Sequence, residues 1–222
     1  MKKLKMVLII IIGILINSFG QLQTIGLQSG LNITNYRSNV APGGTDNRYG
    51  FIGGLGYGLL FQSKYSVDIN FLYNQQGYGD KIIFTDAKGN ILQSGNMKFH
   101  SDYLSFPLKI GYVLGDKFNG FAKVGICPSI LISAQTTTPI INASGSITGE
   151  NTFDSKNSLS KFDLGGLVEL GAGYRIFENF DIFTSLMYSQ SFTNYSKQMV
   201  NGTIRHSGLS LSLGLKYRLK NV

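Results

Sequence analysis

The sequence of 222 residues has no tryptophan, one cysteine, four prolines and two histidines, and only 14% of its residues are charged. The single cysteine, Cys127, excludes an intrachain disulfide and any zinc site built from several cysteines, and we expect it to be a small buried side chain. The formal net charge of +8 includes Lys2, Lys3 and Lys5, and no run of lysine or arginine follows them. Because a basic patch is missing, we expect no nucleic-acid partner.

Long apolar runs are absent after the start of the chain. Residues 6–16 are almost purely apolar and follow three lysines, and the small residue Gly20 precedes Gln21. This arrangement is typical of a secretory signal peptide, and its apolar part is too short to cross the roughly 30 Å hydrocarbon core as a helix. We therefore expect residues 1–20 to be a signal peptide and residues 21–222 to be one exported domain. An uncleaved anchor helix is the alternative.

Glycine, with 28 residues, and aromatic side chains, at 12% of the chain, are plentiful. This composition favours strands and turns over helices. Eight stretches alternate between apolar and polar residues, which places the two kinds on opposite faces of a strand. They are residues 24–34, 49–61, 65–75, 103–113, 120–133, 162–176, 180–191 and 209–219. The last is the most regular, because leucine or tyrosine fills every second position from Leu209 to Leu219.

Two architectures can use such strands: a soluble sandwich with its apolar faces packed together, or a membrane barrel with its apolar faces toward lipid. The stretches exceed the usual soluble strand of about 5–6 residues and suit tilted membrane strands of about 9–11 residues. Their connectors alternate between short ones, at 62–64, 114–119 and 177–179, and long ones, at 35–48, 76–102, 134–161 and 192–207. Outer-membrane barrels sort their connectors in this way. The sequence therefore predicts an all-β, eight-stranded, antiparallel, up-and-down transmembrane β-barrel with short periplasmic turns, long outer loops and both termini in the periplasm.

Some local features are also expected. Residues 81–92 look like a hairpin, because residues 86–89 have turn chemistry and Gly89 suits a positive φ. Residues 134–161 have no periodic pattern, so we expect an irregular, mobile connector. Pro107 falls inside a predicted strand, where it cannot donate a hydrogen bond, and a bulge or irregularity is expected there. In residues 180–191 the polar face is disturbed by Phe183 and Met187, and we expect Ile182, Leu186 and Tyr188 to face outward.

An eight-stranded barrel has an interior just wide enough for its own side chains. Charged residues occupy inward positions of several predicted strands, and the candidate charge cluster in the lumen comprises Asp68, Lys109, Lys123, Glu169, Arg175 and Lys216. Asp163 and Arg218 are also at inward positions. Because buried charges must find partners, we expect these side chains to pair and to plug the lumen. A gated path for ions or solutes through the cluster is the alternative.

The sequence predicts no catalytic, cofactor-binding or metal-binding residues. The two histidines, His100 and His206, are each followed by a serine, but adjacent residues on a strand point to opposite faces and cannot form a nucleophile–base pair. Two distant histidines also give no metal site. We therefore expect neither enzyme activity nor a cofactor.

Tyrosines lie at the ends of several predicted strands. We expect Tyr49, Tyr78 and Tyr103 to belong to the aromatic girdle of a membrane barrel. Other tyrosines in the long connectors accompany arginine or lysine, a combination that also suits a partner-binding surface.

Four pieces of the chain resemble one known family. They are Gly26-Leu-Gln-Ser-Gly-Leu-Asn32, Leu72-Tyr-Asn-Gln-Gln-Gly77, Asp102-Tyr-Leu-Ser-Phe-Pro-Leu108 and Phe162-Asp-Leu-Gly165. On these pieces the chain resembles the Bacteroidota outer-membrane β-barrel domain family, the PorT-like proteins. The resemblance implies a location in the cell outer membrane and, for the members that give the family its name, a link to protein secretion.

The last predicted strand is similar to the signal that the outer-membrane insertion machinery reads. The matching positions are Ser212, Gly214, Tyr217 and Leu219, although the chain continues to Val222. The expected partners are outer-membrane lipid and lipopolysaccharide, the insertion machinery and an envelope protein. We expect a structural or interaction protein linked to envelope assembly or secretion, with a lipid- or small-solute-handling barrel as the alternative.

Overall fold

The computed structural model describes residues 22–39, 45–142, 145–197 and 202–219. The expected signal peptide, residues 1–20, lies outside the described residues. None of the described residues forms a helix long and apolar enough to cross a membrane. Apart from one short 3-10 helix, η1 (Lys156–Ser158), their regular structure consists of β-strands.

The strands extend beyond the stretches that alternate in the sequence. They are β1 (Leu22–Ser38), β2 (Thr45–Phe61), β3 (Tyr65–Thr85), β4 (Ile91–Ser105), β5 (Leu108–Gly115), β6 (Phe118–Ile141), β7 (Ile147–Asp154), β8 (Phe162–Phe177), β9 (Phe180–Ser191) and β10 (Ile204–Leu219). Each predicted stretch falls on one of these strands except residues 103–113, which span β4 and β5.

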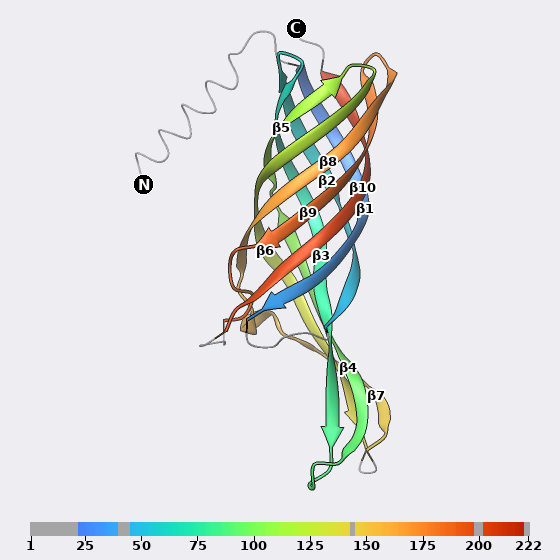
Figure 1. Cartoon of the computed structure of the whole chain (residues 1–222), viewed down its shortest axis with the longest axis vertical. Helices are drawn as coiled ribbons and strands as arrows, with labels where there is room; N and C mark the ends of the chain where they lie inside the picture. Colours follow the sequence, from blue (N-terminus) through green and yellow to red (C-terminus); the bar gives the residue numbers. More distant parts are fainter. Residues whose placement is uncertain (1–21, 40–44, 143–144, 198–201, 220–222) are drawn as a thin grey trace, which may run out of the picture.

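The strands close into one antiparallel barrel (Figure 1). Neighbours around the ring are β2, β1, β10, β9, β8, β6, β4 and β3, and β3 pairs with β2 to complete it. β5 continues the line of β4 between β3 and β6, and β7 stands outside the ring, so the described residues form the predicted eight-stranded barrel. β1 and β10 pair without a break from Thr24 opposite Arg218 to Thr34 opposite Gly208. Closure leaves no strand edge of the barrel wall open, as a hydrocarbon environment requires.

The two ends of the barrel differ. At one, the short-turn end, tight turns join β2 to β3, β5 to β6 and β8 to β9, and both ends of the described chain lie there (Figure 1). At the other, the hairpin end, strands β3, β4, β6 and β7 run beyond the rim.

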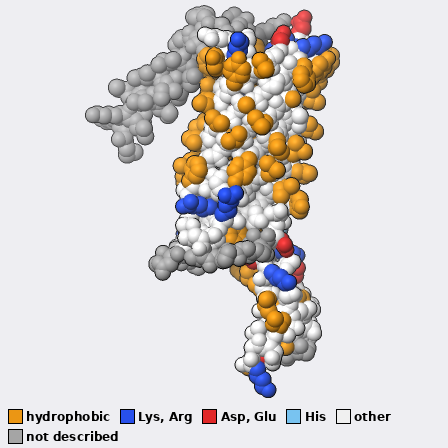
Figure 2. Space-filling model, viewed as in Figure 1, with side chains coloured by type: hydrophobic (Ala, Val, Ile, Leu, Met, Phe, Trp, Pro, Cys, Tyr) orange, Lys and Arg blue, Asp and Glu red, His pale blue; other side chains and the backbone are white. Residues whose placement is uncertain are grey.

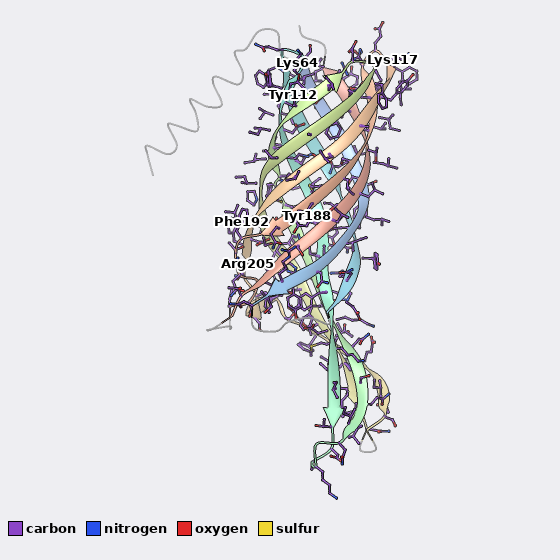
Figure 3. The ribbon with its side chains drawn as sticks, in the orientation of Figure 1. Lys64, Tyr112, Lys117, Tyr188, Phe192 and Arg205 are labelled. Carbon is purple, nitrogen blue, oxygen red and sulfur yellow. The ribbon has the colours of Figure 1, made fainter. Side chains whose placement is uncertain are left out.

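The outer wall is apolar because side chains alternate along each strand. In β10, Leu213 is 62% exposed, whereas its neighbour Ser212 is 4% exposed and faces the lumen. On the face that Figure 2 shows, apolar side chains are spread over the barrel wall between its two ends. Figure 3 places Lys64, Tyr112 and Lys117 near the short-turn end and Tyr188, Phe192 and Arg205 toward the hairpin end. Aromatic and basic side chains at both edges of an apolar band are typical of a barrel that spans a membrane.

The irregularity expected at Pro107 is present. Residues 106 and 107 separate β4 from β5 and are not in a strand. Asn70 N–H still donates to Pro107 O at 3.0 Å, and Phe106 N–H donates to Pro128 O at 2.8 Å. Neither proline has an N–H to return, so each of these residue pairs keeps one hydrogen bond of two. The partners opposite β4 and β5 keep the same register on β3, so the wall continues through the interruption.

Two hairpins project from the hairpin end (Figure 1). The β3–β4 hairpin has the predicted turn, since Gly89 has a φ of +85° and the Asp86 carboxylate accepts hydrogen bonds from Lys88 N–H and Asn90 N–H, each at 2.8 Å. The β6–β7 hairpin corrects the expectation of an irregular connector at residues 134–161. β6 runs on to Ile141, and β7 pairs back along it. The threonines and isoleucines of residues 136–141 favour a strand even without strict alternation.

Candidate functional site

Inward-facing side chains fill the lumen in three layers. From the short-turn end, they are a charge layer (Asp68, Lys109, Lys123, Glu169 and Lys216), an apolar layer (Ile52, Leu72, Leu167 and Met187) and an aromatic cap (Tyr78, Tyr103, Leu159, Tyr195 and His206). β3 passes through all three, because it begins at the short-turn end and presents Asp68, Leu72 and Tyr78 in that order. The three are separated by even numbers of residues, so they share the inward face.

Two buried ion pairs form the centre of the charge layer. Lys109 Nζ donates to Glu169 Oε2, and Lys123 Nζ donates to Asp68 Oδ2, each at 2.7 Å. The four side chains are between 3% and 12% exposed. Around the wall they lie on β3, β5, β6 and β8 in the order Asp68, Lys109, Lys123 and Glu169, so each pair skips one strand and the two pairs cross. Directly opposite residues, Asp68 with Lys109 and Lys123 with Glu169, also differ in sign. This arrangement surrounds each buried charge with opposite charge.

Lys216 joins this layer without a carboxylate of its own. Its Nζ lies 4.4 Å from the ring centre of Phe183 and 5.0 Å from that of Phe121, a cation–π arrangement. Among the described residues it forms no ion pair. The two rings fit because glycines face them: a Cβ at Gly171 would collide with Phe121, and one at Gly214 would collide with Phe183.

Arg175 is placed at the rim of the short-turn end rather than in the charge layer. Its Nη2 donates to Asp116 Oδ1 at 2.6 Å, and its Nε lies 3.7 Å from Asp181 Oδ1. Arg218 Nε and Nη2 both lie 2.8 Å from Asp181 Oδ2. The sequence prediction lacks Asp181, which links the two arginines. Asp181 precedes Ile182, which was expected to face outward. Because adjacent residues on a strand point to opposite faces, the sequence could have identified Asp181 as inward.

The apolar layer is also missing from the sequence prediction. Ile52 and Leu72 are each 1% exposed, and they pack with Leu167 and Met187 against the partly buried Cys127. These residues have outward apolar neighbours, so apolar side chains occupy both faces of the strand there. In a short run such as residues 71–73, apolarity alone therefore does not distinguish the inward residue from the outward ones.

The aromatic cap corrects the expectation for two girdle tyrosines. Tyr78 is 5% exposed and Tyr103 is 1% exposed, both inside the lumen, whereas Tyr49 is 74% exposed on the outer wall. The alternation of each strand explains this, because Tyr78 is an even number of residues from the inward Asp68, and Tyr103 is an even number from the inward Lys109.

Two long connectors fold over the lumen and complete the cap. Leu159 pairs with Ser196 in an isolated bridge, and Ser160 N–H donates to Tyr195 O at 2.9 Å. The Tyr195 hydroxyl lies 2.8 Å from Ser101 Oγ on the barrel wall, and its ring meets that of His206 edge-on at 4.4 Å. These contacts fix the connectors across the hairpin end.

The layers leave a cavity at one end of the lumen. It has a volume of about 310 Å³, opens at the short-turn end and is lined by residues of the charge layer and the rim. Deeper in the lumen are two small cavities of about 20 Å³ each, which leave room for about one water molecule apiece. The described part of the lumen is therefore a cup that opens at the short-turn end and is filled above the charge layer.

The hairpin extension, residues 81–98 with residues 135–154, is a second candidate site. Its two hairpins hold each other through an ion pair of Lys98 Nζ with Glu150 Oε1 at 2.8 Å and a hydrogen bond from Ile147 N–H to Gln93 Oε1 at 2.9 Å. In the β3–β4 turn, hydrogen bonds from Asn90 hold the pKa of the Asp86 carboxyl below its usual value.

Exposed apolar side chains and open strand edges characterise the extension. Its large apolar residues with 37% to 70% exposure are Ile83, Ile91, Leu92, Ile140, Ile147 and Phe153. β7 pairs only with β6 within the described chain, and β3 beyond Asp80 pairs only with β4. Such a surface can dock an apolar partner, and its edges can accept a further strand.

Each histidine and the serine that follows it are adjacent residues of one strand and differ in burial. His206 is 3% exposed inside the cap, and Ser207 alternates to the other face of β10. In the part of the chain that the structure describes, no three His, Cys, Asp or Glu side chains come together in a group that could hold a metal ion.

Most of the chain matches the model of one known protein family. The family described as "Outer membrane protein beta-barrel domain" matches residues 19–197, which include strands β1 to β9. No curated protein matches the chain. The solved structures to which it is similar include Neisserial surface protein A, with 12% identity, a TM-score of 0.45 and coverage of 88% of this chain and 97% of that one. OprG from Pseudomonas aeruginosa has 11% identity, a TM-score of 0.49 and coverage of 90% and 97%. Ail of Yersinia pestis has 13% identity, a TM-score of 0.42 and coverage of 88% and 99%.

Proposed function

The chain belongs to the outer membrane protein beta-barrel domain family, and we propose that it is a structural or interaction protein that binds a partner protein through the hairpin extension. The observation that carries this proposal is the pair of hairpins that project from the barrel with exposed apolar side chains and open edges. The filled lumen supports an interaction role over transport, because the barrel interior is occupied by its own side chains.

The proposal includes an orientation. We propose that the short-turn end and both termini face the periplasm, since outer-membrane barrels have short turns on that side and long connectors outside. The hairpin extension then lies outside the cell, where an envelope or secreted protein can reach it.

The barrel does not need the extension for its own closure. β2 pairs with β3 only as far as Asp80, and β4 pairs with β6 only from Lys98 onward. Residues beyond these points add no wall to the lumen, yet they form ordered strands with apolar side chains exposed to water. This pattern is typical of a surface that a partner covers, and a free edge favours addition of an extended segment.

Photocrosslinking in cells tests the proposal. A photoreactive phenylalanine analogue replaces Ile83 or Phe153 on the extension and, as a control, Lys117 at the short-turn end. We expect discrete crosslinked products from Ile83 and Phe153, and loss of the Phe153 products when residues 82–96 are deleted. Absence of products at both extension positions, or the same products at Lys117, would contradict the proposal.

A groove on the outer wall supports a second candidate, a lipid- or small-solute-handling barrel. The groove has a volume of about 650 Å³, and its apolar lining comes from β2, β3, β5 and β6, with residues such as Tyr57, Val67, Ile110 and Val124. An apolar groove on a lipid-facing wall fits an acyl chain. Deleting the gene and comparing lipid A mass spectra and small-solute uptake tests this candidate; unchanged profiles, together with no conductance of the purified protein in planar bilayers, would remove it.

We further propose that the protein is a non-enzymatic member of the PorT-like family of Bacteroidota. The pieces at 26–32, 72–77 and 102–108 support this assignment.

We also propose that the insertion machinery reads Ser212, Gly214, Tyr217 and Leu219 of β10 before the barrel closes. Replacing Tyr217 and Leu219 together by serine should lower the amount of protein in the outer-membrane fraction, and equal amounts would contradict this reading.

A further inference from the structure

The cavity at the short-turn end has excess positive charge. Its charged lining residues are Asp68, Asp116, Lys123, Arg175, Asp181, Lys216 and Arg218. Four are basic and three are acidic, and the side chain of Asp116 is 86% exposed at the rim, where water and salt screen its charge. Arg175 Nη2 already binds this carboxylate at 2.6 Å, so the interior of the cavity holds three further cations and two carboxylates.

Both interior carboxylates are already paired. Asp68 holds Lys123 at 2.7 Å, and Asp181 Oδ2 holds Arg218 at 2.8 Å. Arg175 Nε and Asp181 Oδ1 have no hydrogen-bond partner, but they face each other at 3.7 Å and can satisfy one another after a small shift. The positive charge without a matching carboxylate in the described chain is that of Lys216.

The ammonium group of Lys216 contacts aromatic rings, whereas those of Lys109 and Lys123 contact carboxylates. The faces of Phe121 and Phe183 attract its ammonium group, but a ring restores only part of the hydration that a partly buried cation loses. A second donor on the cavity wall also lacks an acceptor, since Ser66 Oγ is buried without a hydrogen-bond partner. An ammonium group and a hydroxyl are donors suited to an oxyanion.

We propose that this cavity binds a small oxyanion, a phosphate group, which enters from the short-turn end and docks on Lys216. The anion supplies the ion pair that Lys216 lacks, and Ser66 is a further donor on the wall. The volume of about 310 Å³ is roughly ten times that of a water and accommodates the group with part of its hydration. The excess positive charge of the cavity draws the anion in from the rim. The phosphate belongs either to a free ion or to a lipid headgroup.

Calorimetric titration of the full chain in octyl glucoside, a detergent without phosphate, tests the site. Inorganic phosphate is added at constant ionic strength in one arm, and short-chain phosphatidic acid in the other. We expect saturable binding to the natural sequence and an affinity loss of about tenfold or more in Lys216→Met. Lys117→Met is the matched control, because Lys117 also lies at the short-turn end but does not line the cavity; its affinity should be unchanged.

The variants separate a binding defect from a folding defect. Lys216→Arg keeps the charge and should retain binding, and heat-modifiable migration on gels shows whether each variant forms the barrel. Binding of phosphatidic acid without inorganic phosphate identifies the lipid headgroup as the source, and binding of both identifies the free anion. No binding in either arm, or equal affinity in folded Lys216→Met, would overturn the proposal.

Discussion

Glutamine in place of Glu169 leaves Lys109 as a buried cation without its partner. At the observed 2.7 Å, the two charges attract each other by about 6 kcal/mol when the effective dielectric constant is about 20. This attraction offsets a desolvation cost of several kcal/mol per ion for side chains that are 4% and 3% exposed. The intact pair therefore contributes little to the free energy of unfolding. Breaking it from one side should lower that free energy by about 3–5 kcal/mol, because the remaining charge stays buried.

Urea unfolding in lipid vesicles measures this effect. The chain has no tryptophan, so far-UV circular dichroism and the heat-modifiable gel shift serve as the two signals. We expect a large loss in Glu169→Gln and a much smaller one in the double variant Lys109→Met/Glu169→Met, which removes both charges and keeps the volume. If Glu169→Gln unfolds at the same urea concentration as the natural sequence, or if the double variant is as unstable as the single one, the ion-pair reasoning is refuted.

Other substitutions test the wall, the packing around the charge layer and the extension. Leu213→Arg, in the middle of the apolar face of β10, should cost about 2–4 kcal/mol of unfolding free energy, whereas Tyr217→Arg near the edge should cost about 0–1 kcal/mol; equal urea midpoints would show that the wall does not face lipid. Gly171→Val should collide with the Phe121 ring and reduce the fraction of chains that form the barrel, and heat-modifiable gel migration measures that fraction. Deleting residues 82–96 should leave the unfolding midpoint of the barrel unchanged, because these residues add no wall; a clear drop would show that the extension supports the barrel.

The predicted strands and faces come from a period of two, which depends only on backbone geometry. In β10 the outward leucines and inward serines are where the alternation places them, and Leu213 and Ser212 differ in exposure as expected. The eight alternating stretches predicted eight strands, and the alternation of short and long connectors favoured a closed barrel over a sandwich. The same rule, applied by residue number, also places Tyr78 and Tyr103 inward, although their position at strand ends suggests a girdle.

Contacts between distant strands could not be predicted in this way. The alternation marks Asp68 and Lys123 as inward, but only the barrel shows that each ion pair reaches across an intervening strand and that Lys216 meets two rings instead of a carboxylate. Asp181 and the apolar layer were missed because the strand pattern is disturbed or apolar on both faces at those positions.

The sequence by itself determined the fold class, the eight strands of the ring, their inward and outward faces and the turn at Asp86–Gly89, because each depends on neighbouring residues and on the two-residue period. The tertiary structure decided which inward charges pair, how the long connectors at residues 155–161 and 192–197 close the cap, and that the β6–β7 hairpin joins the β3–β4 hairpin outside the barrel. These features depend on which strands lie opposite each other across a closed lumen. No single stretch of the chain contains that information.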